Sequence, residues 1–167
     1  GFISFVGRPN TGKSSLTNAL VGQKIAITSD RPQTTRKAIR GIKNTENGQL
    51  IIVDTPGLHK PRTLLGQRLN DLVESELSDM DVIGFCSPAH EDLGPGDKRI
   101  IEQMQSYKKP KKIALLTKTD LVGPEKIAER LMSLAAAFYW DEIIPVSSKT
   151  DKQIDLLAEI AIAMMPE

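Results

Sequence analysis

The chain of 167 residues is long enough to bury a hydrophobic core without disulfides or a structural metal, and its length favours a single domain. Its 40% hydrophobic and 26% charged residues are ordinary for a soluble globular protein, and a net charge of +1 excludes a global field that would attract nucleic acid or anionic lipid. The single cysteine, Cys86, excludes an intrachain disulfide framework and favours a packing role in a reducing cytoplasm.

The first predicted element is a strand over Phe2–Val6, whose apolar character is typical of a central strand in a parallel sheet. A glycine-rich loop at 7–14 leads into a predicted helix over Lys13–Val21. An alternating segment at 37–43 predicts an edge strand, and a hairpin turn connects it to a buried strand at 50–53. We expect these two strands to be antiparallel.

A helix is predicted over 64–77, and after residue 81 strands and helices alternate. The predicted strands cover 82–86, 113–116 and 143–146, and the predicted helices cover 98–107, 125–138 and 154–165. Such alternation is typical of βαβ units with right-handed crossovers. Together with the loop at 7–14, whose G-x-x-x-x-G-K-S pattern is that of a phosphate loop, this alternation predicts a three-layer α/β fold of the phosphate-loop NTPase type. It has a six-stranded, mostly parallel sheet, one antiparallel edge strand and helices on both faces.

Residues 7–14 read G-R-P-N-T-G-K-S and match the phosphate-loop pattern between a strand and a helix. Backbone N–H groups of such a loop surround a phosphate, and the helix N-terminus adds partial positive charge. We expect Lys13 to face the outer phosphates and the Ser14 hydroxyl to ligate Mg²⁺. A Gly/Pro turn that matches by chance is disfavoured by the flanking strand and helix. The residues predicted to bind the phosphates are Gly7, Asn10, Thr11, Gly12, Lys13, Ser14 and Ser15.

Three further polar segments also follow predicted strands, and the carboxyl ends of parallel strands form one edge of a sheet. Asp54 ends a buried strand and is predicted to hold the Mg²⁺ shell, while the Gly57 N–H is predicted to sense the terminal phosphate. Thr35 is predicted to complete the Mg²⁺ shell and bind the γ-phosphate, a role for which Thr34 competes. The alternatives are an ordinary Asp-x-Pro-Gly turn and a solvated loop threonine.

The segments at 117–120 and 147–149 predict recognition of guanine. Asp120 can accept two hydrogen bonds from the guanine ring N–H and amine, a donor pair that adenine lacks. The Lys118 stem can lie along the base, and Ser147 can hold Asp120 with its hydroxyl. The residues predicted to form this part of the site are Thr117, Lys118, Asp120, Ser147, Ser148 and Lys149, with the Ser148 N–H facing the guanine carbonyl.

These segments match the five motifs of GTPases, and several stretches resemble the Era family of bacterial GTPases. The stretches that carry the resemblance lie at 7–14, 22–29, 32–36, 39–42 and 54–59, with likeness to actinobacterial members at 18–21 and 61–66. The resemblance covers the whole chain and is specific through residue 66. It implies a GTP-hydrolysing switch in the cytoplasm that assists assembly of the small ribosomal subunit and associates with its rRNA.

The resemblance also implies a KH RNA-binding domain after the GTPase domain. This chain ends at Glu167 without a Gly-x-x-Gly clamp, so we expect residues 1–167 to be the GTPase domain alone, monomeric in isolation. Peripheral association with the inner membrane is a family property. The expected ligands are GTP or GDP, Mg²⁺, and K⁺ near Asn10, which matches a K⁺-binding position of related GTPases. The residues implied in catalysis are Lys13, Thr35, Gly57 and Asn10.

Three departures from the family pattern alter these expectations. Thr117 stands where the family usually has Asn, which predicts weaker guanine binding with specificity kept by Asp120. Ser148 stands where Ala is usual, a mild change because the backbone carries the role. Leu58 occupies the place of the water-orienting Gln of many GTPases, which predicts slow intrinsic hydrolysis, stimulated by K⁺.

Three alternative functions remain. The chain could be the GTPase domain of a tRNA-modifying or tandem-domain relative, or a phosphate-loop kinase acting on a small molecule. The kinase is disfavoured because no lid or acceptor site is apparent and Asp120 with Ser147 indicates guanine. The third is a nucleotide-binding interaction module that hydrolyses nothing, which Leu58 makes conceivable. The basic cluster at 108–112 favours a solvated turn over an RNA contact, and the aromatic run at 138–140 favours packing.

Overall fold

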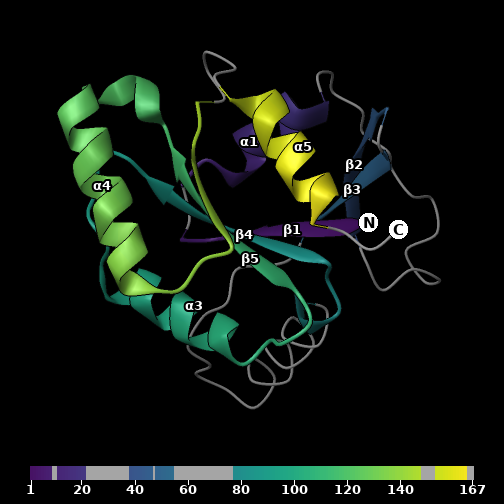
Figure 1. Ribbon diagram of the computed structural model, residues 1–167, viewed down its shortest axis with the longest axis horizontal. Helices are drawn as coiled ribbons and strands as arrows, with labels where there is room; N and C mark the ends of the chain where they lie inside the picture. Colours follow the sequence, from purple (N-terminus) through teal and green to yellow (C-terminus); the bar gives the residue numbers. More distant parts are fainter. Residues whose placement is uncertain (9–10, 22–37, 47, 55–76, 148–152, 165–167) are drawn as a thin grey trace.

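The computed structural model describes residues 1–8, 11–21, 38–46, 48–54, 77–147 and 153–164 (Figure 1). Its centre is a six-stranded sheet with the order β2-β3-β1-β4-β5-β6. The strands are β1 (Phe2–Val6), β2 (Ala38–Thr45), β3 (Gly48–Asp54), β4 (Val82–Pro88), β5 (Lys111–Thr117) and β6 (Glu142–Pro145). Only β2 and β3 pair antiparallel among these strands, and every other pairing is parallel. The predicted mixed sheet with one antiparallel edge strand is confirmed.

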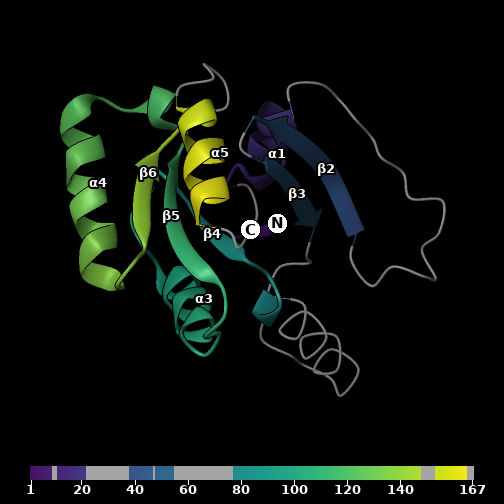
Figure 2. The ribbon, with the colours of Figure 1, turned by 45° about the vertical axis from the view of Figure 1, so that its right-hand side comes forward.

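Helices cover both faces of the sheet, as predicted (Figures 1 and 2). The helices are α1 (Lys13–Val21), α3 (Pro95–Gln105), α4 (Pro124–Ala137) and α5 (Ile154–Ala163), with a short 3₁₀ helix η1 (Thr119–Leu121) that was not predicted. The core below α1 and α5 contains Ile3 and Phe5 of β1, whereas the core on the side of α3 and α4 contains Val6. This division follows from the alternation of side chains along a strand.

The strand β1 lies between β3 and β4, which confirms the prediction of a central, parallel strand. Its register places Ser4 opposite Val53 on one side and Ile83 on the other. Because β1 is central, the loop that follows Val6 emerges in the middle of the carboxyl edge of the sheet. That position brings the loop close to the segments that follow β4 and β5.

Several boundaries differ from the sequence-based ones. The helix α3 begins at Pro95 rather than at 98, because Asp97 accepts a hydrogen bond from Gly94 N–H and closes the first turn. The strand β5 begins at Lys111, whose N–H donates to Asp81 O, so part of the basic cluster is strand and not turn. Apolar patterning misses such polar ends because hydrogen bonds extend these elements, a side-chain bond at α3 and a backbone bond at β5.

The predicted helix at 64–77 lies outside the described residues except for Leu77, which is buried. The packing predicted for the aromatic run at 138–140 is confirmed for two of its residues. The Trp140 ring stacks on Phe85 with 5.6 Å between the ring centroids and meets Phe138 edge-on with 4.8 Å between the centroids, whereas Tyr139 is 94% exposed. Among the helices that the structure describes, none is long and apolar enough to cross a membrane.

Candidate functional site

The loop between β1 and α1 has a backbone that glycine makes possible at two positions. Gly7 has φ +153° and Gly12 has φ +96°, a region that L side chains rarely adopt. A Cβ at Gly7 would also lie 2.8 Å from Cys86 O, so the loop crosses the end of β4 in close contact. The two glycines of the predicted phosphate loop are therefore required by conformation at both places and by space at Gly7.

The carbonyl oxygens in the described part of this loop are bound within the protein. The four bonds are Lys13 Nζ to Gly7 O (2.7 Å), Thr11 Oγ1 to Arg8 O (2.8 Å), Thr117 Oγ1 to Thr11 O (2.6 Å) and Leu16 N to Gly12 O (2.9 Å). In a planar trans peptide the N–H points opposite to the C=O. Because these carbonyl groups point into the protein, the N–H groups of the same peptides point away from it, toward the place where a phosphate would bind.

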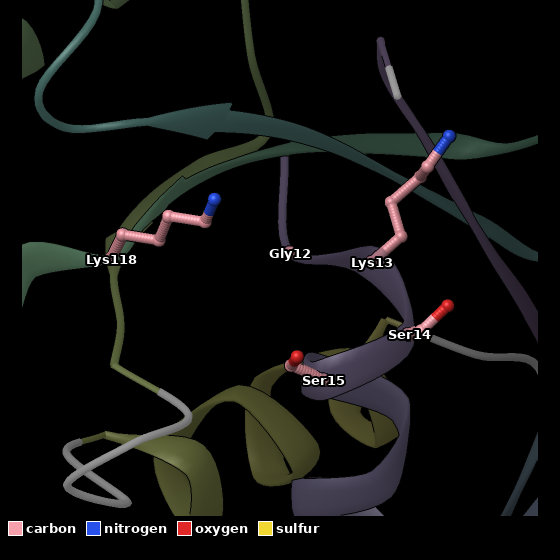
Figure 3. A pocket seen from close by; sticks show the side chains of 5 residues that line it. All are labelled: Gly12, Lys13, Ser14, Ser15 and Lys118. Carbon is pink, nitrogen blue, oxygen red and sulfur yellow. The ribbon is translucent and has the colours of Figure 1, made fainter. Parts of the chain in front are cut away.

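Two lysines and the start of α1 surround a pocket of about 270 Å³ (Figure 3). It is lined by Gly12, Lys13, Ser14, Ser15 and Lys118. In Figure 3 the two serines lie on the first turn of α1, and the Lys118 side chain extends toward Gly12 from the loop after β5. Two ammonium groups and a helix N-terminus favour an anion of several charges.

The loop after β5 is held against the end of β6. Thr119 Oγ1 donates to Val146 O at 3.0 Å, and Lys118 takes a left-handed conformation with φ 56° and ψ 36°. Ser147 Oγ donates to Asp120 Oδ1 at 2.8 Å, so the predicted hydrogen bond between these side chains is present. Ser147 is buried and Asp120 is exposed, which leaves the carboxylate oriented by the protein and open to a ligand.

Thr117 turns toward the phosphate loop. Its hydroxyl donates to Thr11 O, and Thr117 is only 3% exposed. A hydroxyl has one proton to donate, so that proton is used inside the protein. Thr117 therefore links the end of β5 to the loop after β1, and its effect on a ligand is indirect.

Cys86 lies below the loop and has the packing role that the sequence predicted. Burial raises the pKa of its thiol to about 12, although the charge of Lys13 acts in the opposite direction. Cys86 is fully buried and its carbonyl is the atom that faces Gly7. A buried thiol of this kind is inert at neutral pH.

The structure brings together ten of the predicted site residues from three loops. They are Gly7, Thr11, Gly12, Lys13, Ser14, Ser15, Thr117, Lys118, Asp120 and Ser147. Asp54 is the last residue of β3. The remaining predicted residues, Asn10, Thr35, Gly57, Ser148 and Lys149, lie outside the described residues.

Sequence reasoning missed two residues that contact this loop or its neighbours. The motif at 117–120 assigns no role to Thr119, although its hydroxyl donates to Val146 O and joins the loop after β5 to the end of β6. Arg8 was also passed over, although its guanidinium binds Asp97 of α3. The Gly-Pro-Gly-Asp run at 94–97 is a helix-start signal that could have directed attention to Asp97.

The model of the family described as "50S ribosome-binding GTPase" matches residues 2–118. GTPase Era of Nocardioides sp. is 55% identical over 172 aligned residues, with 100% of this chain and 55% of the relative covered. GTPase Era of Leifsonia xyli subsp. xyli is 57% identical over 166 residues, with 99% and 56% covered. The chain thus spans about half the length of the curated relatives it matches, 55% in the first case.

Two structures of Era proteins are among the solved structures that are similar to this chain along its whole length. A variant of Aquifex aeolicus Era bound to GDP and AlF₄⁻ is 31% identical with a TM-score of 0.79, and the match covers 100% of this chain and 57% of that one. Era in complex with MgGDPNP and nucleotides 1506–1542 of 16S ribosomal RNA is 32% identical with a TM-score of 0.80, with the same coverage.

Proposed function

Because the chain belongs to the family described as 50S ribosome-binding GTPases and resembles Era proteins along its whole length, we propose that it binds GTP and GDP and hydrolyses GTP to GDP and phosphate. The observation that carries this proposal is the pocket in which Lys13, Lys118 and the start of α1 meet. Asp120 lies two residues after Lys118, and its hydrogen bond with Ser147 supports guanine as the base.

At the phosphate end, Lys13 faces negative charge and the N–H groups of the loop bind phosphate oxygens. Mg²⁺ would be held by Ser14, with Asp54 and Thr35 as the proposed further ligands. The fit is supported by the donor set, because hydroxyl and carboxylate oxygens suit Mg²⁺, and by the position of Ser14, which is exposed and lines the pocket. When bound, the ion neutralises charge on the phosphates.

At the base end, Asp120 accepts the two N–H donors of guanine while Ser147 fixes its carboxylate. A base without that donor pair leaves the oriented carboxylate unpaired, which costs several-fold or more in affinity. The Ser148 N–H and Lys149 are the proposed partners of the guanine carbonyl side. Thr117 contributes through its bond to the phosphate loop.

For hydrolysis we propose direct in-line attack by water without a covalent intermediate. Gly57 and Thr35 respond to the terminal phosphate, and Lys13 stabilises the charge that develops there. Leu58 cannot orient a water, so the intrinsic rate is slow. Asn10 is the proposed contact for a K⁺ ion that accelerates the reaction.

We also propose a place for the domain in a longer protein. Residues 1–167 form the nucleotide-binding domain, and a KH domain outside this chain carries most of the RNA binding. The relative solved with 16S ribosomal RNA supports a role in assembly of the small ribosomal subunit. Peripheral association with the inner membrane belongs to the same proposal and rests on the resemblance alone.

Calorimetry with GTP, GDP, ATP and XTP tests the base specificity in the parent and in Asp120→Asn. We expect the parent to bind GTP and GDP but not ATP, and the variant to shift toward XTP, because Asn offers a donor where xanthine offers a carbonyl. Unchanged preference in Asp120→Asn would contradict the assignment of Asp120.

Phosphate release in a single turnover tests hydrolysis against a module that only binds. We expect release that needs Mg²⁺ and is faster in KCl than in NaCl. Binding of GTP without release of phosphate would favour the interaction module, and equal rates in the two salts would remove K⁺ from the mechanism.

A further inference from the structure

A buried carboxylate lies next to the phosphate loop but outside the site described above. Asp97, in the first turn of α3, is 0% exposed. Its Oδ2 accepts the Gly94 N–H at 2.9 Å, and its Oδ1 accepts Arg8 Nε at 2.9 Å. One side chain therefore joins the start of α3 to a residue of the phosphate loop that is 89 positions away.

Three parts of Arg8 are held by contacts: its backbone carbonyl, its guanidinium and its aliphatic stem. Its carbonyl accepts the Thr11 hydroxyl at 2.8 Å, and its guanidinium reaches Asp97. Its aliphatic stem lies over Gly96, where an added Cβ would stand 3.1 Å from Arg8 Cδ. A second carboxylate, Glu91, is farther at 3.5 Å and is itself 43% exposed. The hydrogen bond that Arg8 donates to Asp97 is the main cause that raises the pKa of Arg8.

The pair differs from an ordinary surface ion pair. Exposed pairs contribute little because water screens them and ordering the side chains costs entropy. Here the carboxylate is fully buried, so loss of Arg8 leaves a buried acid without its charged partner. The Arg8 side chain that Asp97 holds is attached next to the peptide between Gly7 and Arg8, and the carbonyl of that peptide accepts Lys13 Nζ at 2.7 Å.

We propose that Asp97 is a positioning residue for nucleotide binding, which acts through Arg8 to hold the first peptide units of the phosphate loop in their binding conformation. The inference rests on the proposed function, because it concerns the affinity of that same loop for nucleotide. It assigns to α3 a part in the site, although the pocket is lined by Gly12, Lys13, Ser14, Ser15 and Lys118 and not by Asp97.

The test measures the GDP dissociation constant of the full-length protein by calorimetry, together with thermal unfolding in the absence of nucleotide. The variants are Arg8→Gln, Asp97→Asn and the double variant, with Glu91→Gln as the matched control. Each single substitution is expected to raise the dissociation constant about tenfold, and the double variant no more than that, because the two residues act as one unit. Glu91→Gln is expected to stay within about twofold of the parent.

A merely structural pair would lower the melting temperature and leave GDP binding of the folded protein unchanged, which would overturn the inference. Additive losses, about a hundredfold in the double variant, would overturn it too. Asp97 also lies in the field of the buried Arg130, so Asp97→Asn is the variant more prone to unfold. Arg8 is one-third exposed, and Arg8→Gln alone then decides. If the parent does not bind GDP, the proposed function and this inference are overturned together. If the parent and all variants bind GDP with the same affinity, this inference alone is overturned.

Discussion

Replacing Thr117 by Val tests the link between β5 and the phosphate loop. The Thr117 hydroxyl donates to Thr11 O at 2.6 Å, and both residues are buried. Val has nearly the same shape as Thr, so the substitution removes the donor and changes the packing little. Thr11 O then lacks a donor in a place that water reaches poorly, since Thr11 is 1% exposed.

The magnitude follows from that burial. A buried acceptor without a donor costs about 1–3 kcal/mol of unfolding free energy. In a domain of this size each kcal/mol lowers the melting temperature by about 2–4 °C, so the expected decrease is about 2–12 °C. Because Thr11 directly precedes Gly12 and Lys13, we also expect GDP binding to weaken by up to about tenfold, which corresponds to 1.4 kcal/mol.

Thermal and urea unfolding measure the first effect, and GDP titration by calorimetry measures the second. Thr117→Ser is the matched control, because it keeps the hydroxyl and loses only a methyl group. A Thr117→Val variant that melts at the parent temperature and binds GDP equally would refute the assignment of this bond to either fold or loop.

Three further substitutions test other parts of the structure. Ser147→Ala is expected to weaken GTP binding about three- to tenfold, because Asp120 loses its 2.8 Å donor, and calorimetry checks this; unchanged affinity would contradict the role of the hydroxyl. Burial raises the pKa of the Cys86 thiol from 9.0 to about 12, so above pH 9 the unfolded chain loses the thiol proton while the folded protein keeps it, and the free energy of unfolding falls. Urea unfolding across this pH range should therefore show a steeper loss of stability in the parent than in Cys86→Ala. Parallel pH profiles of the two proteins would argue against this effect. Trp140→Ala is expected to lower the free energy of unfolding in urea by about 3–5 kcal/mol, since the indole is buried and donates to Leu134 O. The control Tyr139→Ala should change it by no more than about 0.5 kcal/mol, and similar values for both would refute this packing.

Patterns within a few residues were sufficient for the sheet and for much of the site. The run Phe2–Val6 followed by Gly7 predicted a central strand and a phosphate loop, because apolar continuity and glycine spacing are both local signals. The bond between Ser147 and Asp120 was also predicted, since the segments 117–120 and 147–149 each follow a parallel strand and meet at the same edge of the sheet.

Contacts between distant residues were not predictable in the same way. The hydroxyl of Thr117 binds Thr11 across 106 positions, and Arg8 binds Asp97 across 89. Neither pair has a motif, because the partner is determined by how β1, β4 and β5 are placed in the sheet. The start of α3 was placed three residues late for a related reason: Asp97 closes the turn with a side-chain bond that apolar periodicity does not register.

The placement of β1 between β3 and β4 has a consequence for the order in which a growing chain gains its binding site. The phosphate loop is synthesised first, yet its Thr11 carbonyl is tied only when Thr117 has been made, and Asp120 is oriented only when Ser147 follows. Contacts of such sequence separation form late, because a long loop must close before they do. The proposed nucleotide affinity should therefore emerge near the end of synthesis of this domain, after Thr117, Asp120 and Ser147 have all been added.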